Sequence, residues 1–463
     1  MKTACSYSKR WFLLENDKLK YTPHTQDDKR RMLDVIGAQS VEDLLKAVPA
    51  ELRVNKLNIG EGLSELELTR LISGKARKNR STKELTSFLG GGAYEHYIPE
   101  VVPALISRGE FLTAYTPYQA EANQGILQCI YEYQSLICEL TAMDVANASM
   151  YDGASALAEA VLLAVRETGK RRVIFCENLN PDYRLVLKTY LSGSNVDIVE
   201  IDYNDLGVID ETALRLKINS DTACVVIQTP NFFGCIEEAE VIEKMCHSSE
   251  ALFIACVNPL SLGVLKPPGE YNADIVVGEG QPLGIALNYG GPYLGFFAVK
   301  EKYLRKMPGR IVGATKDCKG KDGFVLTLQA REQHIRREKA TSNICTNAGL
   351  MALAACIYLS VMGKSGIKEV AEQNIAKSHY LKDQILKLSG YSSKFNQPFF
   401  NEFVIKCAKD PDKINSCLLK HGFIGGLSLG RLSPDLRDCV LICATETKSK
   451  EELDRFVDVL SKY

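Results

Sequence analysis

The chain has 463 residues, of which 46% are hydrophobic and 24% are charged, and its formal net charge is -1. A chain of this length and composition can bury large cores and is expected to form about two or three soluble domains. The balanced charge leaves no overall field that favours nucleic acid or an anionic membrane, so any basic site must be local. The 15 cysteines are odd in number and contain no Cys-x-x-Cys pair, which favours reduced thiols in the cytoplasm.

The N-terminal part of the chain has two characters. Residues 1–20 show no periodicity, and we expect an extension that is disordered and dispensable. Its short apolar block, residues 11–14, is too small for a secretory signal. Residues 21–89 show the start and stop signals of short amphipathic helices, such as Asp27 and Asp28 early, Gly37 late, and Ser40 as a second cap. These helices lack an obvious core of their own, so we expect an arm that lies on a larger body.

Two aromatic, polar segments follow the arm. The first is GGGAYEHYIP at residues 90–99 and the second is YTPYQ at residues 115–119. One interpretation is a pair of connecting loops, which most glycine runs are. The other is a ligand site built from hydroxyl, imidazole and amide groups, with the two interpretations about equally weighted. The candidate residues are Tyr94, His96, Tyr97, Tyr115, Tyr118 and Gln119.

Short segments rich in Val and Ile alternate with helical segments between residues 171 and 300. The strand candidates are RRVIFCEN, NVDIVEIDY, ACVVIQTPN, ALFIACVN, ADIVVGEG and LGFFAVK, which predict a mainly parallel sheet with helices on both faces. Ligands of such sheets bind beyond the carboxyl ends of the strands. The loop after ADIVVGEG contains no lysine between Lys266 and Lys300, and the standard nucleotide-binding motifs are absent from the sequence.

Two further sequence features are candidates for anion binding. Asp152 to Ser155 precede an alanine-rich helix, where free N–H groups could hold a phosphate or where the residues could form a plain cap. A basic run further along favours a carboxylate, a phosphate or an acidic partner, with a solvated helix face as the alternative. It comprises Arg331, His334, Arg336, Arg337 and Lys339, with Asn343 close behind.

The C-terminal part, residues 346–463, is expected to be a compact α+β domain. The apolar run at residues 351–362 is about half the roughly 20 residues that a membrane-spanning helix needs, so we expect a core helix and no membrane association. A second helix near 370–388, two strands and a final amphipathic helix at 450–460 follow.

Several of these segments together resemble the glycine cleavage system P-protein, glycine dehydrogenase (decarboxylating), in its split form, and within it the α subunit or subunit 1. The resemblance runs from about Tyr21 to the C-terminus. The segments that carry it are GGAYEHYIP, YTPYQAEANQG, DVANASMYDGASALAEA, KPPGE with NYGGPY, MPGRIVG and REQHIRREKATSNICT.

The resemblance implies the architecture of the pyridoxal-phosphate-dependent transferases of fold type I, an α/β fold in three layers. It comprises a helical arm at 21–89, a large seven-stranded-sheet domain at 90–345 and the small domain at 346–463. The homologous β subunit is expected to pair with this chain, as α2β2, and to carry the catalytic lysine and the pyridoxal 5'-phosphate. In this chain Gln281 stands in place of that lysine, Asn258 in place of an aspartate, and the stretch around Ser155 lacks a stacking group. We therefore expect a degenerate cofactor site that binds no cofactor covalently.

The activity that the resemblance implies belongs to a complex. With the β subunit, the chain would decarboxylate glycine and transfer the aminomethyl group to the lipoyl group of H-protein. The two tyrosine segments would form a wall of the partner's active site, and the basic run would hold a carboxylate or the acidic carrier. The alternatives are a free-standing pyridoxal-phosphate-dependent lyase or transferase and a non-catalytic scaffold subunit.

Overall fold

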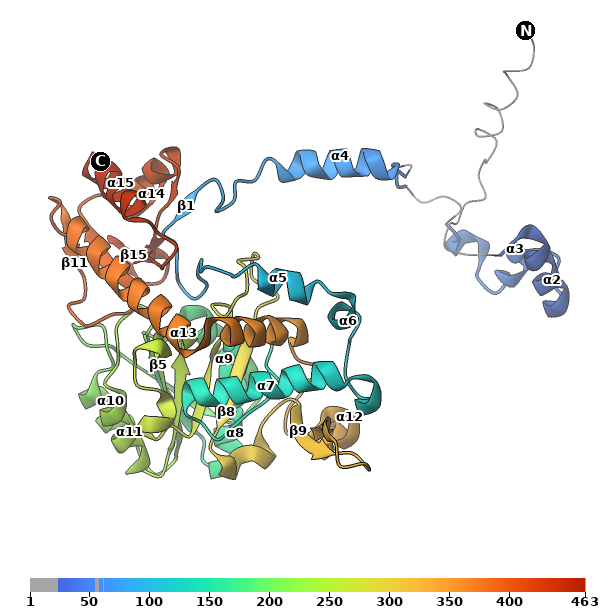
Figure 1. Cartoon of the computed structure of the whole chain (residues 1–463), viewed down its shortest axis with the longest axis horizontal. Coiled ribbons are helices and arrows are strands. Elements are labelled where there is room, and N and C mark those ends of the chain that lie inside the picture. Colours follow the sequence, from blue (N-terminus) through green and yellow to red (C-terminus); the bar gives the residue numbers. More distant parts are fainter. Residues whose placement is uncertain (1–23, 55–57, 61, 463) are drawn as a thin grey trace, which may run out of the picture. The chain divides into compact units, whose positions relative to one another are not determined.

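The computed structural model describes residues 24–54, 58–60 and 62–462 (Figure 1). The chain divides into two units, Met1–Asn79 and Arg80–Tyr463. The predicted extension at residues 1–20 lies outside the described residues.

The first unit contains short helices defined by their caps. They are α2 (Gln26–Ile36), α3 (Val41–Leu44) and α4 (Glu65–Ala76), and none has a buried residue. Thr25, Ser40 and Ser64 each form a capping box that satisfies backbone N–H groups at a helix start. The helical arm and its cap at Ser40 therefore match the sequence pattern.

The arm ends earlier than the predicted residue 89, because the chain joins the second unit at Arg80. Strand β1 (Thr86–Ser87) pairs in parallel with β13 (Phe423–Ile424). The Phe88 ring packs 4.1 Å from the Phe456 ring, measured between centroids. Residues 86–88 thus belong to the core of the C-terminal part.

The large sheet of the second unit has seven strands in the order β2-β8-β7-β6-β5-β3-β4. Neighbouring strands from β7 to β4 are parallel, whereas β8 is antiparallel to both β7 and β2. The predicted mainly parallel sheet is confirmed, and only the two-residue β2 was missed. The strands are β2 (Val145–Ala146), β3 (Arg172–Cys176), β4 (Asp197–Ile201), β5 (Thr222–Thr229), β6 (Leu252–Val257), β7 (Ile275–Glu279) and β8 (Gly295–Val299).

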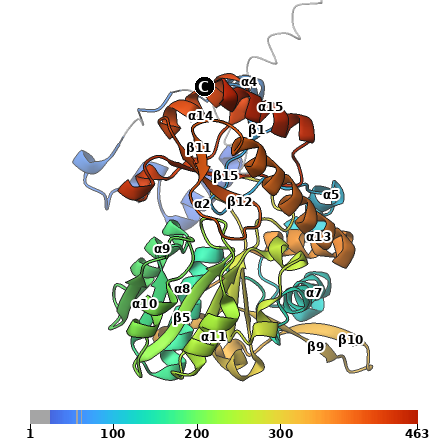
Figure 2. The ribbon, with the colours of Figure 1, turned by 90° about the vertical axis from the view of Figure 1, so that its left-hand side faces the viewer.

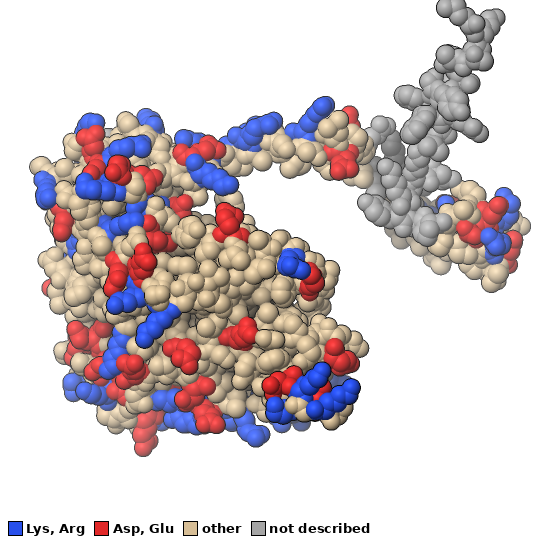
Figure 3. Space-filling model, viewed as in Figure 1, with Lys and Arg blue, Asp and Glu red and all other residues tan. Residues whose placement is uncertain are grey.

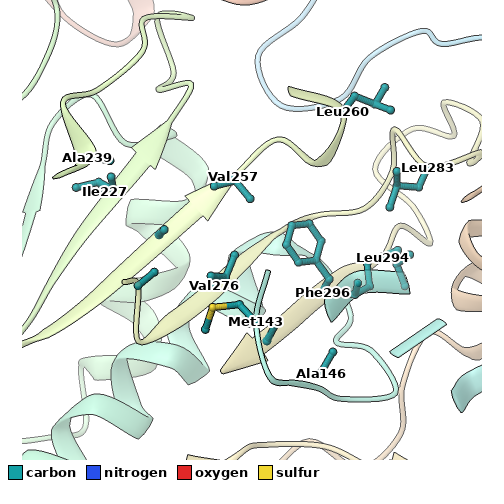
Figure 4. Close-up of a cluster of buried hydrophobic side chains, with 14 of the residues drawn as sticks. Met143, Ala146, Ile227, Ala239, Val257, Leu260, Val276, Leu283, Leu294 and Phe296 are labelled. Carbon is teal, nitrogen blue, oxygen red and sulfur yellow. The ribbon is translucent and has the colours of Figure 1, made fainter. Parts of the chain in front are cut away.

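Helices cover both faces of this sheet, which gives the three layers. Val276 of β7 joins a buried cluster with Tyr133 and Ile242, and its neighbours Ile275 and Val277 join the opposite cluster. Figure 4 shows part of the first cluster, with Val276 beside Phe296 of β8. The first face carries α7 (Gln124–Thr141), α10 (Glu211–Lys217), α11 (Ala239–His247) and part of α13, and the second carries α8 (Gly153–Thr168) and α9 (Pro181–Leu191).

The C-terminal part has a four-stranded antiparallel sheet in the order β11-β12-β15-β14. Its strands are β11 (Tyr391–Ser393), β12 (Glu402–Cys407), β14 (Leu427–Ser428) and β15 (Cys439–Cys443), and its helices are α14 (Pro411–Lys420) and α15 (Lys450–Ser461). The predicted α+β character of this part is therefore present.

The long helix α13 (Gly349–Ile385) connects the two parts of the second unit (Figure 2). The two helices predicted for this stretch meet in a kink at Gly363, whose φ of 59° and ψ of -175° are not helical. By length and composition α13 could cross a membrane, but it packs against α7 and the 3-10 turn Pro259–Gly263.

An antiparallel hairpin of β9 (Ile311–Lys316) and β10 (Asp322–Thr327) extends away from the large sheet and was not predicted (Figure 2). Two glutamines of α7 hold its backbone. Gln134 exchanges two hydrogen bonds of 2.9 Å with the Val312 backbone, and Gln124 does the same with Phe324 at 2.8 and 2.9 Å. The remaining helices are α5 (Val101–Ile106), α6 (Gly109–Leu112) and α12 (Gln333–Arg336).

Candidate functional site

The carboxyl ends of β5, β6 and β7 meet at a small cavity. Its volume is about 30 Å³, and its lining includes Tyr94, Asn258, Glu279 and Glu402. Ligand pockets usually measure roughly 300 to 1,000 Å³, so this cavity has room for a water molecule or two. The expected position for a ligand is therefore filled by the chain itself.

The N-terminus of α8, which we considered as a phosphate cradle, already has an anion. The Gly153 N–H donates to Glu279 Oε2 at 3.0 Å, and the Gln281 and Leu294 N–H groups each donate to Oε1 at 3.0 Å. Burial raises the pKa of Glu279 to about 7. A Cβ at Gly153 would lie 2.2 Å from the hydroxyl oxygen of Tyr183, so a side chain does not fit there.

The three residues that we assigned to a degenerate cofactor site all have structural contacts. Gln281 is 1% exposed; it accepts from the Tyr94 N–H at 2.9 Å and donates to the Tyr94 carbonyl at 2.9 Å. Asn258 caps the turn after β6 by accepting from the Leu260 N–H at 3.0 Å. Ser155 forms the capping box of α8 with Asp152. None of these side chains can form an imine.

The first tyrosine segment divides between buried and exposed side chains. The Tyr94 hydroxyl donates to Glu402 Oε2 at 2.6 Å, and the His96 ring contacts Glu446 Oε2 at 2.8 Å through Nδ1. Both side chains are buried, so neither is presented at the surface. Tyr97, by contrast, is 58% exposed, and its N–H donates to Glu446 Oε1 at 2.7 Å.

The second tyrosine segment meets the basic run at Arg310, which is 4% exposed. Arg310 donates to the Cys345 carbonyl at 2.6 Å and to the Tyr118 hydroxyl at 3.2 Å, and its Nε lies 3.6 Å from Glu332. The Tyr118 ring contacts the His334 ring edge-on, at 5.8 Å between centroids. The second tyrosine segment and the basic run, about 200 residues apart in the sequence, thus lie side by side. Tyr115 and Gln119 of this tyrosine segment are also exposed.

In the basic run, one arginine is bound within the chain and several other cations are exposed. The Arg331 guanidinium donates to the carbonyls of Met307, Gly309 and Leu328, so our expectation that it faces a ligand or carrier is wrong. Arg336, Arg337 and Lys339 are exposed and have no ion pair within residues 24–54, 58–60 and 62–462. Asn343 is exposed as well.

Sequence reasoning missed the polar residues that organise this region. These are Glu279, Glu402, Glu446 and Arg310. A glutamate at the last or first position of a buried strand, as at Glu279 and Glu402, was a usable signal, because an acidic residue in such a place needs donors nearby. The partners of Glu446 come from distant segments, so no local pattern identifies it.

Comparison with solved structures first defines the class of protein. The chain superposes on sphingosine-1-phosphate lyase from Burkholderia pseudomallei with a TM-score of 0.65 at 14% identity, over 89% of this chain and 93% of the other. It superposes on a NifS-like protein with a TM-score of 0.60 at 12% identity, over 82% and 98%. The fold is therefore that of the pyridoxal-phosphate-dependent fold type I proteins, as predicted.

Closer relatives give the family. Residues 19–460 match the family described as glycine cleavage system P-protein. The chain is 56% identical over 440 residues to the probable glycine dehydrogenase (decarboxylating) subunit 1 of Desulfitobacterium hafniense, over 95% of this chain and 98% of the relative. The Geobacillus sp. (strain WCH70) protein of that name is 51% identical over 442 residues, covering 95% and 98%. A crystal structure of glycine decarboxylase (P-protein) in inhibitor-bound form superposes with a TM-score of 0.89 at 42% identity, over 96% and 99%.

The chain therefore belongs to the glycine cleavage system P-protein family, and it matches the chains named subunit 1 over nearly its full length.

Proposed function

We propose that this chain works as the α subunit of the glycine-decarboxylating P-protein, and that a homologous β subunit carries the cofactor. Together they decarboxylate glycine and transfer the aminomethyl group to the lipoyl group of H-protein. The observation that carries the proposal is the near-full-length match to subunit 1 chains, combined with a ligand position filled by Glu279 and Gln281.

The residues around the small cavity do not fit pyridoxal phosphate. A cofactor of this kind needs a lysine for covalent attachment and donors for its phosphate. The cavity of about 30 Å³ is lined by Glu279 and Glu402, and Gln281 is tied to the Tyr94 backbone. Two buried carboxyl groups would oppose a phosphate. This supports a chain without a cofactor of its own.

A face with few charged side chains supports the pairing with the homologous subunit, which we propose to be α2β2. Figure 3 shows few charged side chains over α5, α7 and the first half of α13. Large aromatic side chains are exposed in the loops before α5 and before α7, where Tyr97 is 58% and Tyr115 is 89% exposed, and Tyr289 in the loop after β7 is 98% exposed. Interfaces are rich in such aromatic residues. We assign Tyr97, Tyr115, Tyr118 and Gln119 to the wall of the partner's active site.

The exposed part of the basic run is proposed to meet the carrier or a carboxylate. The His334 ring contacts Tyr118. The exposed residues that follow it closely in the sequence are Arg336, Arg337, Lys339 and Asn343. Of these, Arg336, Arg337 and Lys339 have no ion pair in the described part of the chain and are free to bind an acidic protein.

The test is glycine-dependent CO2 exchange in the presence of lipoylated H-protein. The chain alone and the lysine-bearing subunit alone should be inactive or nearly so, and their mixture should be active. A mixture no more active than the lysine-bearing subunit alone would refute an α-subunit role.

A scaffold that stabilises the partner from a distance remains the alternative to a wall of the active site. Replacing Tyr97 and Tyr115 by Phe distinguishes the two, because the phenylalanine variants keep the exposed rings and lose only the hydroxyl groups. Loss of exchange activity with pairing intact supports the wall, and full activity supports the scaffold.

We place the complex in the cytoplasm. The cysteines from Cys129 to Cys443 are free thiols, which fits a reducing compartment.

A further inference from the structure

The segment Gly91–Tyr97, called the strap below, contains neither helix nor strand, yet it is held along its length by side chains from outside it. Asn180 donates to the Gly91 carbonyl at 3.1 Å, and Thr445 donates to the Glu95 carbonyl at 2.6 Å. These holders come from both the large-sheet part and the C-terminal part of the second unit. The strap is therefore a joint between them.

Gln281 holds the middle of the strap as a neighbouring strand would. Its amide accepts from the N–H and donates to the carbonyl of the same residue, Tyr94, which are the two bonds that an antiparallel partner exchanges. Its nitrogen also donates to the Ile285 carbonyl at 2.8 Å, so the amide is used on both sides. Among side chains, only Asn and Gln carry an amide group, with a donor nitrogen and a separate acceptor oxygen, and Asn is shorter.

Glu279 in turn fixes the residue that makes this bridge. Its carboxyl group accepts from the N–H groups of Gln281, Gly153 and Leu294, which belong to the loop after β7, the start of α8 and the start of β8. A helix N-terminus attracts an anion, and here the chain supplies that anion from its own side chain. Glu279 is thus an internal substitute for a bound anion.

We propose that Gln281 is a positioning residue for the strap, and that Glu279 is the internal anion that keeps Gln281 in place. The residues around the small cavity then serve to present the strap and its exposed Tyr97, and the cavity binds no ligand of its own. The effect of Gln281 on the activity of the complex rests on the proposed function. Its positioning role within the chain does not.

The first test is amide hydrogen exchange of the full chain. Gln281→Met keeps the length of the side chain but removes both bonds to Tyr94, so exchange at Tyr94 should rise about tenfold or more. Gln134→Met is the matched control, since Gln134 forms the same pair of bonds with Val312; it should raise exchange in the hairpin and leave the strap unchanged. Unchanged strap exchange in Gln281→Met overturns the proposal.

The second test needs no change at Gln281. Glu279→Ala removes the internal anion, and sodium formate offers a carboxylate of matching size. Formate should raise the melting temperature of this variant more than sodium chloride of equal ionic strength, and it should have no such effect on the wild-type chain. An equal response to the two salts overturns the role of Glu279.

The third test separates this inference from the proposed function. In the mixture with the lysine-bearing subunit, Gln281→Met should lower kcat for CO2 exchange about tenfold, with the affinity between the subunits within about twofold of wild type. Faster strap exchange together with unchanged kcat would support the positioning role and overturn the wall of the active site. Unchanged strap exchange overturns the positioning role whatever the activity.

Discussion

Three glutamates lie in the interior without a cationic partner in the part of the chain that the structure describes. They are Glu237, Glu279 and Glu402, which are bound instead by amide, backbone and hydroxyl groups. Burial raises the pKa of each to about 7, from an ordinary value of 4.5. Between these two values the folded chain keeps protons that the unfolded chain releases. Above about pH 7 the Glu279 carboxylate is the anion that its three N–H donors hold. The contribution of the three glutamates to stability therefore falls as the pH rises from about 4.5 to about 7, and is level above that.

Glu402→Gln tests this pH dependence. Glutamine imitates the protonated carboxyl group and can still meet Tyr94 and the Gly91 N–H. Wild type should lose stability relative to the variant between pH 5 and pH 8, by up to about 3 kcal/mol, measured by denaturant unfolding. The exposed Glu121→Gln is the control and should follow wild type. Parallel curves for wild type and Glu402→Gln would contradict the buried, neutral carboxyl group.

The exposed cations of the basic run carry the second residue-scale prediction. Arg336→Ala with Arg337→Ala should leave the melting temperature unchanged, because neither side chain has an ion pair in the described ranges. Each exposed charge contributes up to about 1 kcal/mol, so H-protein affinity for the complex should fall about five- to tenfold at low salt and less at high salt. The measurement is a binding titration, with Lys413→Ala as a control on another surface. Unchanged affinity would mean that the basic run is only a solvated helix face.

At the scale of elements, the kink of α13 depends on one residue. Gly363 has φ 59° and ψ -175°, a region that only glycine enters without strain. No atom lies within 4 Å of a Cβ built on it, so a substitution would suffer from backbone strain and not from a clash.

Gly363→Ala should therefore lower the free energy of unfolding by about 1 to 3 kcal/mol. Gly349→Ala, in the first turn of the same helix and also without a close contact, should cause no loss, because alanine is the better helix former. Chemical denaturation of the two variants beside wild type makes the comparison. Equal stability of the two variants would mean that the kink does not need glycine.

The elements that were predictable have a local signal, and the others do not. The Val- and Ile-rich strands of the large sheet and the Ser40 cap follow from short patterns. The hairpin β9–β10 was missed because its backbone is held by two glutamines of α7 that are distant in the sequence. Gln134 lies 178 residues from Val312, and Gln124 lies 200 residues from Phe324. In the candidate site, Gln281 could be located by resemblance, but its bonds to Tyr94 bridge 187 residues and needed the structure.

At the scale of the whole molecule, the helices of the first unit lack a core. α4 exposes Leu66, Leu68, Leu71 and Ile72, each between 46% and 59%, and has no buried residue. Isolated helices of this length are marginal in water, so their apolar side chains need another surface. This agrees with the proposed pairing, in which the chain is one part of a larger assembly.

We propose that this chain has exchanged cofactor binding for a positioning role in a complex. Visible absorbance of the pure chain after incubation with pyridoxal phosphate and borohydride reduction tests it most directly, with Gln281→Lys and the mixture with the lysine-bearing subunit measured in parallel. We predict no reducible band on the wild-type chain, weak binding and no exchange activity for Gln281→Lys alone, and both band and activity in the mixture. A stoichiometric, borohydride-reducible band on the wild-type chain by itself would contradict the account.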